Sequence, residues 1–478
     1  MGVGFAAVTS KPYVSGTTIY AGNGTPLRLQ GFNAEPAQLN SEDIQWLKNN
    51  GFNNLRLNIM WHRYEPQKGV YSNTYFNKLD EIINLCEQND IYVILNFHQM
   101  VLSPYFTYYA GSTGVGFPTW LISGGGYQDS STGAQKCAAD FFTNQGYGIT
   151  MRQEYLKFWQ YLVNRYRSYN CVWAYELINE PTVVPSASWT QQMLEGVMDL
   201  YETMTPLIRQ IDPKTIIIYH YINFNPNPYN YNDGVEHAVP YPNIVWTRSW
   251  YDVAYGGYSS SELGNLQTRI TNIKNKFNGD CQAPFINSEM GLSVSEYPSG
   301  RESSGSAWIR DSFDTMRNVG LNNGYECYSW YHYHLGPRYG YWSGRNSDGS
   351  NTFITPVLKE YITEGTSPEP EPTTPPSGSS GVSSVGIRNL AGSTDYISVR
   401  FQLFNDGVEV FDSEWTGGIM LQNGEDYTVA VPGVVATELH VSISDIDYAG
   451  SSVIVNGASV FNLPTNNDQT SNYNIQLD

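Results

Sequence analysis

The sequence predicts a (β/α)8 barrel over residues 1–365, an α/β fold, followed by a smaller all-β sandwich over residues 382–478. Three observations predict this arrangement. In the first part, apolar segments of strand length alternate with amphipathic helical segments, which is typical of a parallel sheet. In the last part, short runs alternate apolar and polar residues, as strands of a sandwich do. Between them, residues 366–381 are rich in Pro, Thr and Ser and contain no aromatic or large aliphatic residue.

The barrel follows from the number and order of its elements. Eight strands fit a closed barrel better than an open doubly wound sheet, and no Gly-rich phosphate motif follows the first strand. Residues 13–29 are expected to form a hairpin across one end. Strands are predicted at 27–31, 54–59, 92–97, 172–178, 215–219, 244–247, 285–288 and 325–330, and helices at 41–50, 76–89, 152–167, 189–210, 263–277 and 307–319.

The segment 366–381 should be an extended, semi-rigid linker, because it has nothing to bury. The sandwich after it is predicted from alternating runs such as 397–404 and 439–443, separated by turn signals such as Asn405-Asp-Gly407. This part has two basic residues against twelve Asp and Glu, so it carries −10 of the chain's −19. Solvated charge explains these acids better than a calcium site, since no dense Asp loop is present.

The composition narrows the possible partners. A net charge of −19 argues against binding to nucleic acid or to an anionic membrane, because both require a basic surface. No apolar run approaches the length of a membrane span, and no secretion signal is recognised at the start of the chain. Five scattered Cys without a C-x-x-C pair make a structural zinc site unlikely. We expect a monomer without cofactor or metal, secreted or held at the cell surface, since linkers of this kind usually join extracellular domains.

Polar residues at the ends of the predicted strands are the candidates for chemistry, because barrel enzymes place their reactive groups there. Two of them are carboxylates, Glu180 after the fourth strand and Glu289 after the seventh. Such a pair is what glycoside hydrolysis requires: one group protonates the leaving oxygen and the other attacks the sugar. The other candidates are Arg56, His98, Asn179, Tyr251 and Trp330.

These residues stand in strings that resemble glycoside hydrolase family 5, the cellulase-type retaining glycosidases. The resemblance covers residues 13–365, and the strings are Leu29-Gln-Gly-Phe-Asn33, Leu55-Arg-Leu57, Val93-Ile-Leu-Asn-Phe-His98, Leu177-Ile-Asn-Glu-Pro181, Phe285-Ile-Asn-Ser-Glu-Met-Gly291 and Trp330.

The resemblance implies that Glu180 is the acid/base and Glu289 the nucleophile. Asn179 would hold the sugar 2-OH, and Arg56 would lie beneath Glu289 and keep it ionised. Tyr251 would donate a hydrogen bond to the nucleophile. His98 would support the site, and Trp330 would form the floor of the sugar subsite.

One position departs from the family pattern. The family usually carries His two residues before the tyrosine, whereas this chain has Ser249-Trp-Tyr251. Serine does not titrate near neutrality, so the family's pH behaviour does not transfer directly. The pair His332 and His334 is interpreted as packing or sugar contact rather than a metal site, and His62 as part of a loop.

The substrate class rests on the residues around the cleft. The segment 99–150 is predicted to be a long loop that shapes the cleft, and Trp61, Trp120, Trp250 and Trp342 are candidate stacking platforms for a sugar chain. With the linked sandwich, these favour an endo-β-1,4-glucanase acting on a plant-type polysaccharide. A β-mannan-cleaving or glycosylceramide-cleaving enzyme is the alternative, the latter suggested by His98-Gln99, Ser103 and Gly116-x-Pro-x-Trp120. A non-catalytic carbohydrate-binding protein is a third possibility, which the two glutamates and Arg56 oppose.

Overall fold

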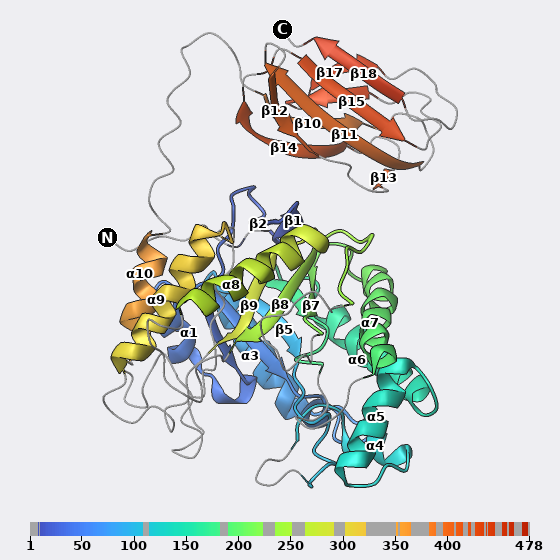
Figure 1. The fold of residues 1–478 in the computed structure, drawn as a ribbon. Coiled ribbons are helices and arrows are strands. Elements are labelled where there is room, and N and C mark those ends of the chain that lie inside the picture. Colours follow the sequence, from blue (N-terminus) through green and yellow to red (C-terminus); the bar gives the residue numbers. More distant parts are fainter. Residues whose placement is uncertain are drawn as a thin grey trace. The chain divides into compact units, whose positions relative to one another are not determined.

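The computed structural model divides the chain into two compact units, Met1–Ser367 and Pro368–Asp478 (Figure 1). It describes residues 8, 10–108, 114–181, 190–222, 235–250, 263–290, 302–321, 350–351 and 354–364 of the first unit. In the second it describes 382–388, 395–405, 408–413, 419–421, 426–434, 436, 438–444, 452–456, 458–462 and 471–476. The predicted linker and the predicted eighth barrel strand, 325–330, lie outside the described residues.

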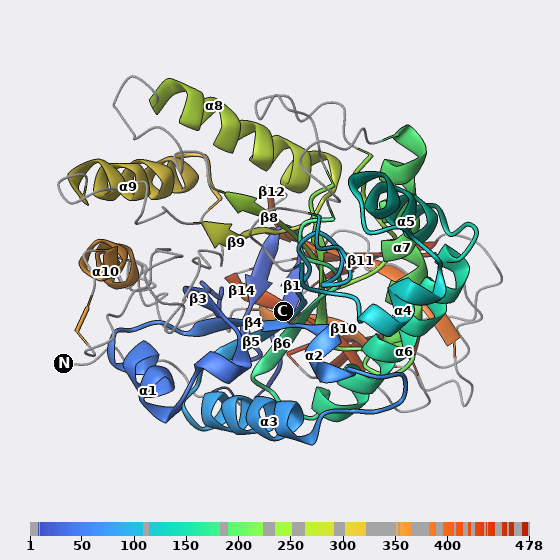
Figure 2. The ribbon, with the colours of Figure 1, turned by 90° about the horizontal axis from the view of Figure 1, so that it is seen from below.

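The first unit is built on a parallel sheet of seven described strands that follow one another in chain order. Helices surround this sheet, as the view along the barrel in Figure 2 shows. The arrangement confirms the predicted (β/α)8 barrel. The strands are β3 (Gly31–Ala34), β4 (Asn54–Ile59), β5 (Tyr92–Phe97), β6 (Val172–Glu176), β7 (Ile216–His220), β8 (Ile244–Trp250) and β9 (Phe285–Met290).

The helices carry an apolar stripe toward the strands and begin at capping residues. In α1, the Asn40 side chain accepts from two backbone N–H groups, and Asp43 accepts from the Asn40 N–H in return. The Ser72 hydroxyl caps α3 in the same way. The helices are α1 (Ser41–Asn49), α2 (Trp61–Tyr64), α3 (Asn73–Gln88), α4 (Thr119–Gly124), α5 (Ser131–Thr143), α6 (Gly148–Tyr166), α7 (Gln191–Arg209), α8 (Leu263–Lys274), α9 (Glu302–Asn318) and α10 (Ile354–Glu364), with short turns η1 (Pro36–Gln38) and η3 (Asn275–Asp280).

The first barrel strand lies further along the chain than predicted. Residues 27–30 belong to no strand. The N-terminal hairpin strands β1 (Tyr13–Ser15) and β2 (Thr18–Tyr20) pair as expected, and the Leu27 N–H donates to the Ile19 carbonyl over 2.8 Å. The sheet begins only at Gly31, where a Cβ would lie 1.5 Å from the Asn54 carbonyl oxygen. Residues 27–30 and 31–34 both alternate in apolar character, so the sequence pattern alone could not tell which of the two segments forms the barrel strand.

Among its described residues, the predicted loop 99–150 contains the helices α4 and α5 and the start of α6, so the prediction of an irregular segment was wrong. In α5 the buried residues recur at helical spacing: Ala134, Cys137, Ala138, Phe141 and Phe142. Helix α5 packs against α6 and α7. It approaches α7 so closely that a Cβ on Gly196 would lie 2.0 Å from the Phe142 carbonyl oxygen.

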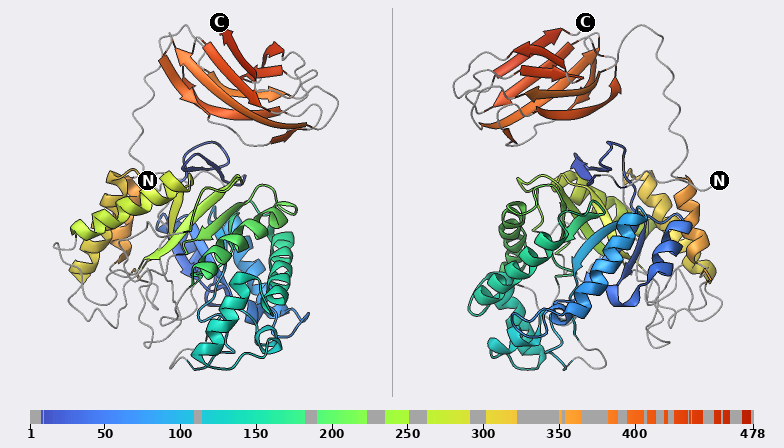
Figure 3. Two further views of the ribbon diagram at one scale, coloured as in Figure 1. Left: turned by 45° about the vertical axis from the view of Figure 1, so that its right-hand side comes forward. Right: turned by 180° about the vertical axis from the view of Figure 1, so that it is seen from behind.

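The described residues of the second unit form two antiparallel sheets, shown from two sides in Figure 3. Their strand orders are β14-β10-β16-β17 and β12-β11-β15-β18, with β13 paired to β11. Residues from both sheets share one core, including Ile387, Phe401, Leu439 and Val453. The strands are β10 (Val382–Arg388), β11 (Asp395–Asn405), β12 (Val408–Asp412), β13 (Ile419–Leu421), β14 (Asp426–Val434), β15 (Glu438–Ser444), β16 (Ser452–Val455), β17 (Ala458–Asn462) and β18 (Ser471–Gln476).

Candidate active site

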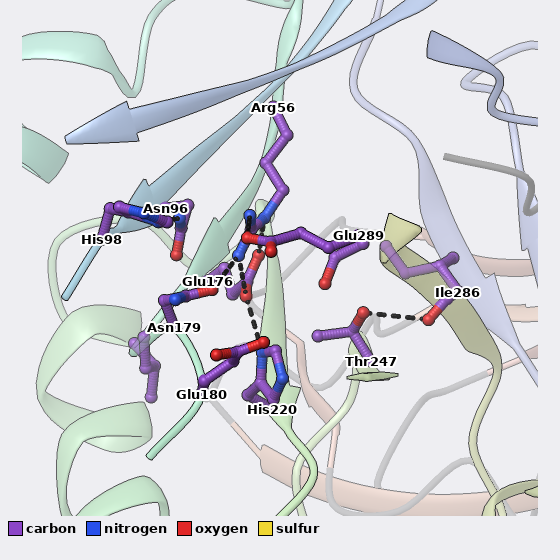
Figure 4. Close-up of polar contacts among 12 residues, drawn as sticks. Arg56, Asn96, His98, Glu176, Asn179, Glu180, His220, Thr247, Ile286 and Glu289 are labelled. Carbon is purple, nitrogen blue, oxygen red and sulfur yellow. Dashed lines mark hydrogen bonds and ion pairs between the residues drawn. The ribbon is translucent and has the colours of Figure 1, made fainter. Parts of the chain in front are cut away.

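Polar side chains from β4, β6, β7, β9 and the segment after β6 meet in one cluster (Figure 4). Arg56 comes from β4 and Glu289 from β9, both buried, whereas Asn179 and the half-buried Glu180 lie three and four residues beyond the end of β6. Two further members were not predicted: Glu176 at the end of β6 and His220 at the end of β7. Parallel strands bring their carboxyl ends to one rim, which is why residues over 200 positions apart in sequence can meet.

Arg56 is the centre of this cluster, and all five of its N–H donors have an acceptor. Nε and Nη2 bind the two carboxylate oxygens of Glu176, at 2.5 and 2.6 Å. Nη1 binds Glu289 Oε1 at 2.6 Å and the Asn33 side-chain oxygen at 2.7 Å, and Nη2 also reaches the Asn179 oxygen at 2.9 Å. The guanidinium is therefore held in one orientation, in which Nη1 points at Glu289.

The ion pairs of Arg56 with Glu176 and Glu289 stay charged although all three side chains are buried. The side chains of Arg56 and Glu176 have no exposed surface. Burial would lower the pKa of Arg56, but the charges of Glu176 and Glu289 outweigh it and raise that pKa above its ordinary value. Burial would raise the pKa of Glu176, yet the Arg56 charge and the His220 hydrogen bond lower it to about 2.

His220 completes the support of Glu176. Its Nδ1 lies 3.0 Å from Glu176 Oε1. Because Glu176 is ionised at neutral pH, the carboxylate can only accept, so Nδ1 carries the proton and donates it. A carboxylate that fixes an imidazole in one tautomer and orientation is a recurring device in enzyme sites.

The nucleophile candidate Glu289 is held through its backbone as well as its carboxylate. Its N–H donates to the Asn287 side-chain oxygen at 3.0 Å. The neighbouring Ser288 carbonyl accepts from the Asn33 side-chain amide at 2.6 Å, which ties β9 to β3. The carboxylate of Glu289 is almost completely buried, with 2% of the side chain exposed. These contacts give it a fixed position at the bottom of the site.

Glu180, the acid/base candidate, lies in a different environment. Its side chain is half-buried, and its backbone has φ +33°, on the left-handed side that non-glycine residues rarely adopt. Such a conformation costs on the order of 1–3 kcal/mol and persists only where the surroundings hold it.

Arg248 on β8 lies over the Tyr221 ring, 5.5 Å from its centroid. Burial lowers the pKa of Arg248, and the charges of Tyr221 and Glu180 oppose that effect.

The remaining predicted positions are placed as follows. His98 is buried after β5, and its Nδ1 accepts from the Asn96 side-chain amide at 3.1 Å. Because Nδ1 accepts, Nε2 of the neutral ring carries the proton and is the donor. Tyr251 and Trp330 lie outside the described residues, as do His332 and His334.

Ser249, which stands where the family usually has His, lies on β8 and is paired in register with Glu289 on β9. Its hydroxyl oxygen is buried and has no hydrogen-bond partner within the described part of the chain. His62 was expected in a loop but lies on the short helix α2, where its Nδ1 accepts from the Gly116 N–H at 3.3 Å. Burial, followed by the charge of Arg63, lowers the pKa of His62 to about 4.

Two of the four tryptophans proposed as sugar platforms have packing roles. Trp61 is 1% exposed and packs among aromatic rings, including those of Phe117 and Phe158. Trp120 is only partly buried, but its ring contacts Trp61 edge-on and its Nε1–H donates to the Glu65 carbonyl at 3.0 Å. The side chains of Trp250 and Trp342 are outside what the structure describes.

Glu176 and His220 could have been suspected from the sequence. Both end apolar runs of strand type, Val172-Trp-Ala-Tyr-Glu176 and Ile216-Ile-Ile-Tyr-His220. A charged side chain in a strand that is buried on both faces needs a partner, and the partner must come from another strand.

Within the described ranges, no group of three or more His, Cys, Asp or Glu side chains is placed to hold a metal ion.

The sequence profile of the cellulases, glycosyl hydrolase family 5, matches residues 20–333, about two thirds of the chain. The chain belongs to glycosyl hydrolase family 5. This confirms the resemblance to the glycoside hydrolases seen in the sequence. No helix among the described residues combines the length and apolar character needed to cross a bilayer.

Among its relatives are two endoglycoceramidases. That of Hydra vulgaris is 25% identical over 230 residues, which are 41% of this chain and 43% of the relative. That of Cyanea nozakii is 24% identical over 218 residues, or 38% and 42% of the two chains. The matched segment thus spans less than half the length of each of these relatives.

Solved structures with the same fold include endo-glycoceramidase II from Rhodococcus sp. in its ganglioside GM3 complex. It has a TM-score of 0.58 and 16% identity, covering 98% of this chain and 99% of that one. An endogalactoceramidase has a TM-score of 0.53 and 16% identity, covering 88% and 99%. At these identities the likeness establishes the fold, and for the Rhodococcus protein it extends over both units of this family 5 hydrolase.

Proposed function

We propose that this family 5 hydrolase is an endoglycoceramidase: it cleaves the β-glycosidic bond between the sugar chain of a glycosphingolipid and its ceramide, with retention of configuration. The observation that carries the proposal is the sequence similarity to two endoglycoceramidases over the barrel. The packed positions of Trp61 and Trp120 support it, because they remove two of the platforms on which an extended polysaccharide would stack. The expectation of a cellulase therefore becomes the second candidate.

In the first step, the Glu289 carboxylate attacks the anomeric carbon while Glu180 donates its proton to the departing ceramide oxygen. The bond from the anomeric carbon to that oxygen breaks, and an ester to Glu289 forms. Arg56, 2.6 Å from Glu289 Oε1, favours the ionised nucleophile that this attack requires. The Asn179 side chain, which donates to the Gln99 carbonyl and accepts from Arg56, is the candidate contact for the sugar 2-OH.

In the second step, Glu180 takes a proton from water, and the water oxygen attacks the same anomeric carbon from the face that ceramide has left. The ester breaks, Glu289 leaves as a carboxylate, and the sugar is released with its original configuration. During the ester stage Glu289 carries no charge, and Glu176 remains as the charge partner of Arg56. Glu176 therefore keeps the guanidinium in place through the whole cycle.

The test is hydrolysis of lactosylceramide in detergent micelles beside carboxymethylcellulose, measured as released oligosaccharide and ceramide. We expect turnover of the glycolipid and little release of sugar from the polymer. Glu180→Gln and Glu289→Gln should each abolish hydrolysis of the glycolipid. Glu154→Gln is the matched control and should retain it, because Glu154 is a largely buried carboxylate paired with Lys68 and Lys157 on the outside of the barrel, on α6. Faster hydrolysis of the polymer than of the glycolipid would replace this proposal by the cellulase.

The second candidate, an endo-β-1,4-glucanase, has one observation in its favour: the matching family profile is described as that of the cellulases. We place either activity outside the cell, on the grounds that a Pro/Thr/Ser-rich linker joins the two units. Detection of the enzyme in culture medium rather than in the cell pellet of its host is the corresponding test.

A further inference from the structure

The side-chain amide of Gln99 joins two parts of the active-site rim. Gln99 follows His98 at the end of β5 and is 2% exposed. Its Nε2 donates to the backbone carbonyl of Asn179 at 2.9 Å and to that of Glu180 at 2.5 Å. The Asn179 side-chain amide donates back to the Gln99 carbonyl at 3.1 Å. One buried glutamine therefore contacts the backbone of both residues in the acid/base segment.

This glutamine lies between two stretches of strained backbone. Glu180 has φ +33°, and on the other side Val101 and Leu102 have φ +56° and +61°. Gln99 Oε1 accepts from the Leu102 N–H at 3.0 Å, so the same amide group bonds to both stretches. None of these three residues is glycine, and β-branched Val101 is especially poorly suited to this region. Strain of this kind gathers at functional sites when the surroundings enforce it.

The loop that carries Val101 and Leu102 is itself held firmly. Met100 forms an antiparallel bridge with Val115, with both N–H···O distances at 3.0 Å. The Phe117 N–H donates to the Leu102 carbonyl at 2.7 Å, and a Cβ on Gly116 would lie 2.4 Å from that carbonyl. Gln99 is thus anchored on a rigid base, and its contact with the acid/base segment is a fixed one.

Only a glutamine amide in this orientation meets every requirement of the position. The two carbonyls of the acid/base segment need donors, and the Leu102 N–H needs an acceptor. Rotating the amide by half a turn would bring oxygen against two carbonyl oxygens. A glutamate would do the same, and methionine would remove the donor that Gln99 supplies to both carbonyls.

We infer that Gln99 is a positioning residue for the acid/base: it holds the Glu180 backbone in its left-handed conformation and so aims the carboxyl group at the glycosidic oxygen. The inference rests on the proposed role of Glu180 as acid/base. The Gln99 amide donates to the Glu180 carbonyl, so its loss acts on proton transfer by Glu180. Its second bond, to the Asn179 carbonyl, affects the sugar contact, which is the same for any two substrates with the same sugar. Loss of the Gln99 amide should therefore slow the steps in which Glu180 donates or accepts a proton.

The experiment compares Gln99→Met with the unchanged enzyme on two substrates with the same sugar, lactosylceramide and 2,4-dinitrophenyl β-lactoside. Ceramide is a poor leaving group that requires an acid, and dinitrophenolate leaves without one. We expect kcat/KM on the glycolipid to fall about tenfold or more, and on the aryl lactoside less than about threefold, since proton transfer contributes about 10²–10⁴ in such enzymes.

The aryl lactoside also reports on the second step, which needs Glu180 as a base. In Gln99→Met that step should become rate-limiting, so that kcat and KM fall together. A burst of dinitrophenolate should appear, and intact mass measurement should detect the glycosyl-enzyme. A variant that was only less well folded would lose active enzyme on both substrates equally and would accumulate no intermediate.

Gln30→Met is the matched control, because Gln30 is a buried glutamine whose amide contacts the Tyr361 carbonyl away from Glu180. It should show no difference between the two substrates. If Gln99→Met does not fold, Gln99→Asn keeps an amide but is too short to reach both carbonyls, and it serves with the same expectations.

Equal losses on both substrates, or no loss on either, would overturn the positioning role of Gln99. An unchanged enzyme that hydrolyses neither substrate, or a Glu180→Gln variant with normal activity on the glycolipid, would instead overturn the proposed function. The two failures are therefore distinguishable in one set of measurements.

Discussion

Replacing Arg56 by methionine should move the acidic limb of the kcat/KM profile to higher pH. The substitution removes one positive charge and keeps most of the side chain's bulk. Arg56 is 2.6 Å from the proposed nucleophile, Glu289, which has 2% of its side chain exposed. Because only the ionised carboxylate attacks, any change that favours its protonated form removes activity at the acidic end first.

The size of the shift follows from the ion pair. Two unit charges about 4 Å apart at an effective dielectric constant of about 20 interact by about 4 kcal/mol, and one pH unit corresponds to about 1.4 kcal/mol. That sets an upper limit of about 3 units. With partial relaxation, the acidic limb should move up by about 1–3 units, the range that a close cation accounts for. The basic limb, assigned to Glu180, should move less.

The same substitution has a stability consequence through Glu176. The pKa of Glu176 in the folded enzyme is about 2, below its ordinary value. A lowered folded-state pKa stabilises the fold above the unfolded-state pKa, and this contribution is lost as the pH falls from about 4 toward 2. Arg56→Met removes the larger cause of the lowering, the Arg56 charge, and leaves the His220 hydrogen bond, so the variant should lose about 3–5 kcal/mol at neutral pH. That loss should diminish in acid, where both buried carboxylates are protonated.

The assay is a pH profile of kcat/KM for the glycolipid, with folding checked by circular dichroism at each pH. Arg152→Lys is a suitable control for the loss of a buried arginine away from the site, because Arg152 binds backbone carbonyls of α5 and α7. A folded Arg56→Met enzyme with an unmoved acidic limb would refute the proposed electrostatic role. Reduced activity without a shift of the acidic limb of the kcat/KM profile would show that Arg56 has only a structural role.

Three further predictions follow from other contacts. The carboxyl groups of Glu180 and Glu289 should lie roughly 5–5.5 Å apart, and NMR of the first-formed product should show retained configuration; an inverted product would exclude double displacement. Ending the chain after Thr366 should leave hydrolysis of soluble substrates almost unchanged, because the two units have separate cores; a folded but inactive barrel would contradict this. Gly196→Ala should lower stability by about 1–3 kcal/mol in thermal unfolding, because its Cβ would meet the Phe142 carbonyl at 2.0 Å; an unchanged Tm would show that α5 and α7 separate easily.

Much of the fold could be predicted from the sequence, because its signals are local. Strands such as β4 and β5 are continuous apolar runs with both faces buried, and their predicted and observed bounds coincide. The helix start at Asn40–Asp43 follows from a capping pattern of four adjacent residues. Helix α5 was missed, although its buried residues have helical spacing, because it lies in a segment rich in Gly and polar residues.

The candidate site likewise has a part that local sequence signals predict and a part that they do not. The family strings identified Glu180, Glu289 and Arg56, because the residue types and their order along the chain are visible in the sequence. The way in which Arg56 shares its N–H groups between Glu176 and Glu289 is not visible there. That sharing depends on where three strands end relative to one another, and register between strands is a property of the closed sheet.

The sequence by itself therefore determined the fold class and the family, and it predicted the pair of carboxylates. Only the tertiary structure decided which groups support that pair. Glu176 and His220 entered the site because β6 and β7 are neighbours in the barrel. Gln99 reached the Glu180 backbone because β5 and β6 end side by side. Hydrogen bonds act over about 3 Å, and residues far apart in the sequence come that close only when the barrel has closed.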